Sequence, residues 1–378
     1  MELPGQEDRI TVIISTSPVR SNPSTDMLHG TLSSLAMVPL LHKAPKILVC
    51  DGCNVVASGK KAQHKAGRVS AEDEQNYAEF KRNVRLLAET GEPPFDNLVV
   101  IEKSRRDGFG FAIHRGLVEV DTKYVMVMQH DQQLVSRFDL PAVLSAMDEC
   151  PEVKYVGLCS ENTKHYAEMI RSRYNLILER TLAFGGVPLI PLIFWYDKPH
   201  VCNTKHYRDV VFGKQNPFRK DAATKGADGV DAVDSKVSED RQLENKREPS
   251  DLTAPLERSQ KERPHGIVRR GDFIEEAFGL AMLADIVANG LGAHSKYGAY
   301  QLDEEDTGPT SGSGDGRNAG SRIHVMHVHG RRFWTLDQRA ERGWPETQTE
   351  TIQKRCAARS IVESNSEPEI DGAQGEGQ

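Results

Sequence analysis

The sequence predicts an α/β fold with a mainly parallel central sheet flanked by helices. Short apolar runs rich in β-branched residues recur along the first 160 residues, and amphipathic helical patterns separate them. Such runs are typical of buried strands, and their alternation with helices predicts a sheet that is covered on both faces. Because ligands of these sheets bind at the carboxyl ends of the strands, polar residues that follow a strand are the first candidates for a site.

The elements follow in order along the chain. Strands are expected at 10–14, 46–50, 98–102, 124–131 and 155–159. The helices between them are expected to start at Ser24 or Thr25, at Ser70, near residue 108 and at Asp139. Ser70 and Asp73 have the spacing of a capping box, and so do Asp272 and Glu275 at the start of a helix expected over 272–289. A last strand is expected at 322–330.

Three stretches are poor in large apolar residues, so we expect one domain built from residues 8–213 and 265–345. Burial cannot offset the ordering entropy of residues 214–264, which predicts a disordered insertion. A disordered loop at 303–321 and a disordered tail at 346–378 are expected for the same compositional reason.

Composition narrows the class of protein. The formal net charge is −7, which argues against a protein that wraps nucleic acid with a basic face. The amino-terminal residues lack the basic and apolar regions of a signal peptide. The most apolar segment, 182–196, is too short for a membrane helix and contains Pro188 and Pro191. Six scattered cysteines are typical of reduced thiols, and we expect a soluble, cytoplasmic protein without an integral membrane segment.

Polar residues follow two of the expected strands. The strand at 124–131 ends in Gln129, His130 and Asp131, and the strand at 46–50 is followed by Asp51. The carboxyl ends of parallel strands share one edge of the sheet, so Asp51 and Asp131 should converge on one cleft. A carboxylate there can hold a divalent cation against a diphosphate, although an Asp that only caps the next turn is equally consistent with the sequence.

A wider resemblance is carried by the segments ITVIISTSP, ILVCDGC and SRRDGFGFAIHRGLVEVDTKYVMVMQHD. Together they resemble the nucleotide-sugar-binding half of glycosyltransferases with the nucleotide-diphospho-sugar transferase (GT-A) fold. The resemblance is strongest to the large inverting family that includes cellulose and chitin synthases. It implies a nucleotide diphosphate sugar as donor, a hydroxyl acceptor, and Mn²⁺ or Mg²⁺ as cofactor.

The resemblance assigns donor-binding positions in the first half of the chain. The nucleoside would be held by Ser15, Thr16, Ser17, Pro18 and Asp51. The acidic motif would hold metal and diphosphate, with Asp131 as the metal ligand and with Gln129 and His130 beside the donor. The family usually has Asp-x-Asp at this motif, whereas here Gln129 replaces the first carboxylate.

Basic residues flank the same edge. Arg105, Arg106 and Arg115 could neutralise diphosphate oxygens, because a guanidinium suits bidentate contact with such groups. For any one of these residues, a solvated surface position is the simpler interpretation. The cluster beside Asp131 is what favours donor binding, with Arg105 and Arg115 as our candidates.

The second half offers an acidic pair in GDFIEEAFG. The capping box accounts for Glu275, whereas Glu276 lies in the first turn of the expected helix and can point into a cleft. The resemblance places an acidic pair here whose second member deprotonates the acceptor hydroxyl. This implies Glu276 as catalytic base, with Glu275 as its partner. A helix-start acid favoured by the helix dipole is the alternative.

The last strand, at 322–330, places His327 and His329 on one face and His324 on the other. Some GT-A enzymes complete their metal site with a late histidine. By position, His327 or His329 would join Asp131 as a metal ligand, and a solvent-facing histidine is the alternative.

We therefore expect a glycosyltransferase that is metal-assisted and inverting. A sugar-phosphate nucleotidyltransferase is one alternative, although the loop STSPVRSNPST lacks the glycines that such enzymes usually carry after the first strand. The other alternative is a catalytically degenerate binding module, which the missing carboxylate at Gln129 suggests. The donor sugar, the acceptor and the oligomeric state do not follow from the sequence.

Overall fold

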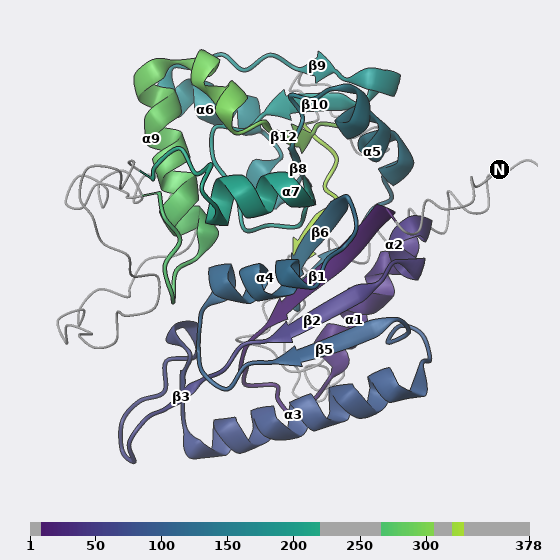
Figure 1. The fold of residues 1–378 in the computed structure, drawn as a ribbon, viewed down its shortest axis with the longest axis vertical. Coiled ribbons are helices and arrows are strands. Elements are labelled where there is room, and N and C mark those ends of the chain that lie inside the picture. Colours follow the sequence, from purple (N-terminus) through teal and green to yellow (C-terminus); the bar gives the residue numbers. More distant parts are fainter. Residues whose placement is uncertain (1–8, 220–265, 306–319, 329–378) are drawn as a thin grey trace, which may run out of the picture.

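A nine-stranded sheet forms the centre of the computed structural model, which describes residues 9–219, 266–305 and 320–328 (Figure 1). The strand order is β5-β2-β1-β6-β11-β8-β12-β10-β9. Helices cover both faces of this sheet, so the expected α/β class with a parallel central sheet is confirmed.

The parallel half of the sheet comes from the apolar runs of the first 130 residues. It contains β1 (Ile10–Thr16), β2 (Lys46–Cys50), β5 (Leu98–Glu102) and β6 (Tyr124–Gln129). β1 lies between β2 and β6 and pairs in parallel with both, and β2 pairs in parallel with β5. All seven residues of β1 are buried, as expected for a β-branched strand inside a parallel sheet.

The other half of the sheet contains most of the antiparallel pairs. It is formed by β11 (His200–Asn203), β8 (Tyr155–Gly157), β12 (Ala299–Leu302), β10 (Pro188–Pro191) and β9 (Thr181–Leu182). β11 runs antiparallel to both β6 and β8, and it therefore joins the two halves. Of these strands we expected only β8, because its residues begin the apolar run at 155–159, whereas the others are short and have no sustained alternation.

The helices are α1 (Asp26–Ser34), α2 (Pro39–Lys43), α3 (Ala71–Thr90), α4 (Phe109–Val118), α5 (Leu140–Glu149), α6 (Tyr166–Tyr174), α7 (Thr204–His206) and α9 (Leu280–Asn289). Short π-helical segments, Tyr207–Phe212 and Glu275–Gly279, follow α7 and precede α9. The capping box of Ser70 and Asp73 is confirmed at the start of α3, and the Asp139 side chain caps α5 by accepting the Ala142 N–H.

Two small sheets and several 3₁₀ turns complete the described chain. β13 (Val325–His327) pairs with β7 (Gln132–Leu134), and β3 (Asn54–Val55) pairs with β4 (Arg68–Val69). The 3₁₀ turns are Leu35–Met37, His64–Ala66, Glu161–Thr163, Phe184–Gly186 and Leu291–Lys296.

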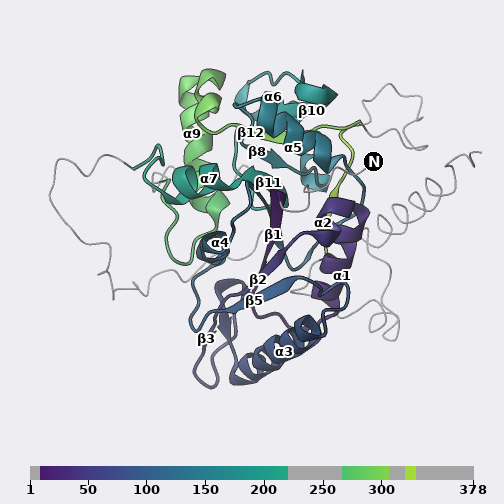
Figure 2. The ribbon, with the colours of Figure 1, turned by 45° about the vertical axis from the view of Figure 1, so that its right-hand side comes forward.

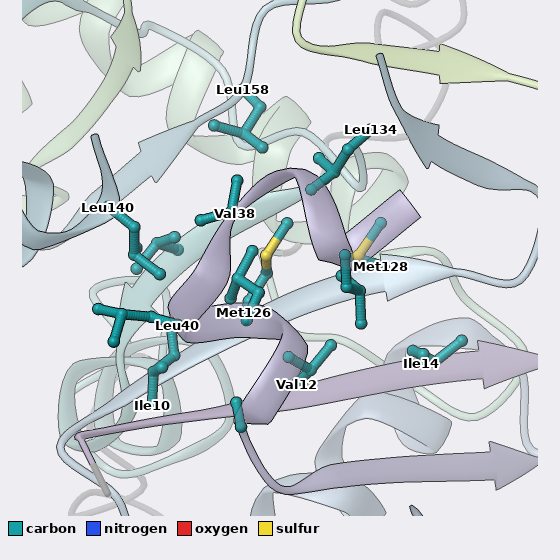
Figure 3. Packing of buried hydrophobic residues seen from close by; sticks show 14 of the residues in the cluster. Ile10, Val12, Ile14, Val38, Leu40, Met126, Met128, Leu134, Leu140 and Leu158 are labelled. Atoms are coloured by element: carbon teal, nitrogen blue, oxygen red, sulfur yellow. The ribbon is translucent and has the colours of Figure 1, made fainter. Parts of the chain in front are cut away.

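Two apolar cores lie on opposite faces of the sheet. Ile10, Val12 and Ile14 of β1 face the core under α1, α2, α3 and α5, whereas Ile13 faces the core under α4, α6 and α9. Figure 3 shows the first core, where Met126 and Met128 of β6 lie beside these β1 side chains. In Figure 2, α4, α7 and α9 lie on one side of the sheet and α1 and α2 on the other.

The start of the helix that leads into α9 differs from our expectation. The helix begins at residue 274 rather than 272. Asp272 accepts the backbone N–H of Arg269 at 2.9 Å, and the Glu275 N–H donates to the Asp197 carboxylate at 3.3 Å. These two bonds replace the predicted capping box, because a distant acidic residue provides the acceptor that Asp272 was expected to supply.

Parts of two segments that composition predicted to be disordered have a defined structure. Asn216 donates through its side chain to the carbonyls of Val211 (3.0 Å) and Gly266 (3.1 Å), so residues 214–219 are structured. Residues 303–305 and 320–321 are also structured, with a bridge between Glu305 and Ser321. The remainder of the predicted insertion, loop and tail lies outside the described residues. Within the described ranges, no helix is long and apolar enough to cross a membrane.

Candidate functional site

A hollow of about 530 Å³ opens at the carboxyl ends of β1, β2 and β6. Six residues expected at the donor site line it, namely Ser15, Thr16, Ser17, Asp51, Gln129 and His130. Pro18, the residue after Ser17, is buried. The strands bring these residues together because parallel neighbours end at the same edge of the sheet.

Asp51 holds the loop that leads into α4. Its two carboxylate oxygens accept the backbone N–H groups of Asp107 and Gly108, each at 2.8 Å. Burial raises the pKa of Asp51, and these hydrogen bonds act in the opposite direction by favouring the carboxylate. The loop lies so close that any side chain at Gly52 would collide with the Arg105 backbone. Asp51 is therefore a structural anchor at the border of the hollow.

The loop residues that Asp51 positions include Arg106, which lines the hollow. Its neighbour Asp107 is buried and forms ion pairs with the side chains of Lys103 and Arg270 (2.5 Å for Arg270). The Asp107 carbonyl accepts the Gly271 N–H at 2.7 Å. The loop is thus tied both to Asp51 and to the segment that precedes Phe273.

Two glycines allow this close approach. Gly108 has φ +82° and ψ 166°, a backbone conformation that residues other than glycine rarely adopt. A Cβ atom there would also lie 2.7 Å from the Gly271 Cα. The contact brings Phe109 and Phe273 together at the hollow, with ring centroids 5.7 Å apart and an interplanar angle of 17°.

Arg105 and Arg115 are not among the residues that line the hollow. The Arg105 side chain is 71% exposed and lies 3.7 Å from Asp107. Arg115 is in the last turn of α4 and pairs with Glu119 at 2.5 Å. Arg106, which we grouped with them but did not select, is the arginine of that cluster that lines the hollow. Which arginine points into the hollow depends on the path of the loop before α4, and the sequence spacing of the arginines does not predict that path.

The end of β6 connects three parts of the site. Gln129 donates through its side-chain amide to the Asp197 carbonyl at 3.2 Å. The His130 backbone N–H donates to the Ser15 carbonyl at 3.0 Å, and its ring nitrogen Nδ1 lies 3.2 Å from the same oxygen. His130 therefore helps to hold the ends of β1 and β6 together.

Asp131 lies against His327, with 3.0 Å between the carboxylate oxygen Oδ2 and the imidazole nitrogen Nε2. The pairing of β13 with β7 brings them together, because it sets His327 opposite Gln132. His324, just before β13, is buried, and its Nε2 lies 3.2 Å from a carboxylate oxygen of Glu304. His329 lies outside the described residues.

The side chains of Asp131 and His327 are of the kinds that bind divalent cations. One carboxylate oxygen and one imidazole nitrogen are donors that Mn²⁺ accepts, and diphosphate oxygens and water could fill the other positions. Asp131 is buried, whereas the His327 side chain is 46% exposed, so a ligand can reach the pair from one side. In the described part of the chain, no group of three or more His, Cys, Asp or Glu residues forms a complete metal site.

The acidic pair Glu275 and Glu276 begins the π-helical turn. The Glu275 side chain is half-buried and accepts the Asp197 backbone N–H at 3.2 Å. Glu276 is exposed, and no described residue forms a hydrogen bond or an ion pair with it. The two neighbours therefore have different surroundings, and the Gln129–Asp197–Glu275 bonds connect them to the end of β6.

Asp197 and Lys198 were not among our candidates. Burial, followed by repulsion from Glu275, raises the pKa of Asp197 well above its usual value. Burial also lowers the pKa of Lys198 to about 8. The signal that could have found them is a charged pair directly after the apolar, aromatic run that ends at Tyr196.

Comparisons with known proteins find similarity in part of the fold. No family model and no curated protein matches the chain. The mannosyltransferase PcManGT from Pyrobaculum calidifontis, solved with GDP-Man and Mn²⁺, matches 53% of this chain at 15% identity and a TM-score of 0.33. TarS 1-349 from S. aureus matches 53% at 14% identity and 0.32. A 4-diphosphocytidyl-2C-methyl-D-erythritol synthase from Anaerococcus prevotii matches 53% at 13% identity and 0.28, over 73% of its own chain. This chain spans about half the length of the first two, 46% and 48%.

Proposed function

We propose that this chain is an inverting glycosyltransferase that moves a sugar from a nucleotide diphosphate sugar to a hydroxyl acceptor. Three observations carry the proposal: the hollow at the strand ends, the Asp131–His327 pair that directly follows β6, and the Glu275–Glu276 pair that is linked to β6 through Gln129 and Asp197. These are the three groups that donor binding, charge neutralisation and acceptor activation require.

The hollow would hold the nucleotide. It combines the aromatic side chains of Phe109 and Phe273 with the polar groups of Ser15 and Ser17, a mixture that is typical of small-molecule sites. Arg106 would contact a phosphate, because a guanidinium provides several donors in a fixed geometry. Asp51 would act indirectly, by fixing the loop that carries Arg106.

Asp131 and His327 would hold Mn²⁺ or Mg²⁺. When bound, the cation would neutralise charge on the diphosphate leaving group. The nucleoside diphosphate could then leave the anomeric carbon with less cost in free energy.

Glu276 would accept the proton of the acceptor hydroxyl as its oxygen attacks the anomeric carbon. An exposed carboxylate without a partner among the described residues is available to a substrate, whereas Glu275 is held by Asp197. Glu275 would therefore position the turn on which Glu276 lies.

Donor hydrolysis tests this assignment. Wild type and the Glu276→Gln and Glu275→Gln variants would be incubated with UDP- and GDP-sugars and Mn²⁺, and release of the nucleoside diphosphate would be followed. We expect Glu276→Gln to lower the rate by about 10²-fold or more, the usual contribution of a general base. Its affinity for the nucleotide should stay unchanged.

Equal background release by wild type and Glu276→Gln would overturn the enzymatic assignment and favour a binding module. The replacement of a carboxylate by Gln129, whose amide is used in the bond to Asp197, is the observation behind that second candidate.

A further inference from the structure

Lys198 lies at the edge of the sheet where the proposed reaction takes place. It precedes β11 by two residues, and β11 runs antiparallel to β6 and β8, so Lys198 is at the edge where β6 and β8 end. Its ammonium group donates to Ser160 Oγ at 2.8 Å and lies 5.0 Å from the centre of the Tyr196 ring.

No described carboxylate lies within ion-pair distance of this ammonium group. Glu275 acts on it only through longer-range attraction. A half-buried cation without a direct counterion is costly in a folded protein, and an anionic ligand would remove much of that cost.

Ser160 is suited to the same ligand. Its oxygen accepts the bond from Lys198, and Thr163 Oγ1 lies 3.5 Å away in a contact where either hydroxyl can be the donor. When Thr163 is the donor, the Ser160 hydrogen is available to a ligand. An ammonium group and a hydroxyl hydrogen together match the oxygens of a phosphate or a carboxylate.

β13 connects Ser160, and through it Lys198, to the candidate metal ligand His327. Ser160 forms a bridge with Val325, and His327 follows two residues later, about 6.7 Å along an extended strand. On the other side, Asp197 is the neighbour of Lys198 in the chain and binds Glu275. Lys198 is thus linked through Ser160 and Val325 to the strand that carries His327, and through Asp197 to Glu275.

We propose that Lys198 and Ser160 bind an anionic group, a phosphate or a carboxylate, that is carried by the transferred sugar or by the acceptor. The inference rests on the proposed function for the identity of the ligand. The anion site itself rests only on the contacts of Lys198 and Ser160.

Thermal unfolding in inorganic phosphate tests the anion site without any nucleotide. Wild type would be compared with Lys198→Met, Lys198→Arg and the control Lys205→Met, which removes an exposed lysine on α7. A ligand that binds the native state raises Tm. We expect phosphate to raise the Tm of wild type, Lys198→Arg and Lys205→Met, and to raise that of Lys198→Met much less. An equal rise in Lys198→Met would overturn the site.

A second measurement identifies the source of the anion. The affinity for UDP-glucuronate would be compared with that for UDP-glucose, and the affinity for glucose 6-phosphate with that for glucose in the presence of UDP and Mn²⁺. A preference of about tenfold for one anionic ligand, lost in Lys198→Met, would assign the anion to the sugar or to the acceptor. No preference in either pair would overturn the assignment to substrate. Failure of UDP and GDP to bind, beside a Lys198-dependent effect of phosphate, would overturn the proposed function and leave the anion site.

Discussion

Asp197 and Glu275 exchange two hydrogen bonds, although 78 residues separate them in the chain. The Asp197 backbone N–H donates to the Glu275 carboxylate at 3.2 Å, and the Glu275 backbone N–H donates to the Asp197 carboxylate at 3.3 Å. Gln129 donates to the Asp197 carbonyl, so the end of β6 is joined to the same pair. This arrangement fixes the turn that carries Glu276 relative to the hollow.

The first prediction concerns the hydrogen bond that the Asp197 carboxyl accepts from the Glu275 N–H. Replacing Asp197 by Asn keeps an acceptor for the Glu275 N–H, so at about pH 4, near the ordinary pKa of the carboxyl, Asp197→Asn should change the free energy of unfolding by less than about 1 kcal/mol. Asp197→Ala leaves that N–H without its acceptor and should cost about 1–3 kcal/mol. Urea denaturation of both variants measures the difference. Equal losses in the two variants would contradict the hydrogen-bonding role.

The pH dependence of the same residue follows from its raised pKa. Above the ordinary pKa of the carboxyl, the native state keeps the Asp197 proton while the unfolded state loses it, so this residue's contribution to stability falls as pH rises through that window. Asp197→Asn removes this contribution. The stability of the variant relative to wild type should therefore increase with pH, and a constant difference would contradict the raised pKa.

The second prediction concerns Asp51. Asp51→Ala leaves the N–H groups of Asp107 and Gly108 without an acceptor, and it should lower the free energy of unfolding by about 2–5 kcal/mol. Asp51→Asn keeps one carbonyl oxygen and should lose less. The comparison is made by urea denaturation at neutral pH. A loss below about 1 kcal/mol in Asp51→Ala would show that the loop is held by other contacts.

The third prediction compares two glycines with positive φ. Gly108→Ala introduces a Cβ 2.7 Å from the Gly271 Cα, whereas a Cβ at Gly91, which ends α3 with φ +66°, would have no neighbouring atom within 4 Å. Gly91→Ala should cost about 1 kcal/mol, the cost of the left-handed conformation alone. Gly108→Ala should cost clearly more, because backbone must also move. Similar losses in the two variants would contradict the close contact of the two loops.

The fourth prediction concerns acid stability. Burial lowers the pKa of His206 to about 4, although its bond to the Tyr297 carbonyl acts in the opposite direction. Between pH 6.5, its ordinary pKa, and about 4, the unfolded state binds a proton that the native state does not, so stability falls as pH falls through that window.

The His206→Gln variant should lose part of this pH dependence, by up to about 1.4 kcal/mol per pH unit. Chemical denaturation between about pH 4 and 7 measures it, with His29→Gln, at an exposed position on α1, as control. An unchanged slope in His206→Gln would contradict the lowered pKa.

The parallel half of the fold was predictable because each strand is a continuous apolar run with its own turn signals. Strands β9 to β12 were not, since two to four residues carry too little pattern and their pairing depends on distant segments. β11, for example, lies between β6 and β8 because it pairs in antiparallel fashion with both.

The candidate site was also predictable only in part. Ser15, Asp51 and Gln129, which lie at the ends of parallel strands, line one hollow, whereas Asp131, which we expected at the same cleft as Asp51, is not among its lining residues. The sequence could not show that the Asp51 carboxylate is occupied by backbone N–H groups, because this depends on how a loop crosses Gly52. The Asp131–His327 contact agrees with the expected pairing, and their binding of a metal stays a prediction.

The most direct test of the central claim is the binding of nucleoside diphosphates with and without Mn²⁺. Isothermal titration of UDP and GDP would compare wild type with Asp131→Asn and with the control Asp148→Asn, a carboxylate that pairs with Arg9 and with Tyr124 at the opposite end of β6. We predict that one nucleotide binds wild type and the control at least about tenfold more tightly with Mn²⁺, and that Asp131→Asn loses this gain. Binding of neither nucleotide to folded wild type, or an equal effect of Mn²⁺ in Asp131→Asn, would contradict the account.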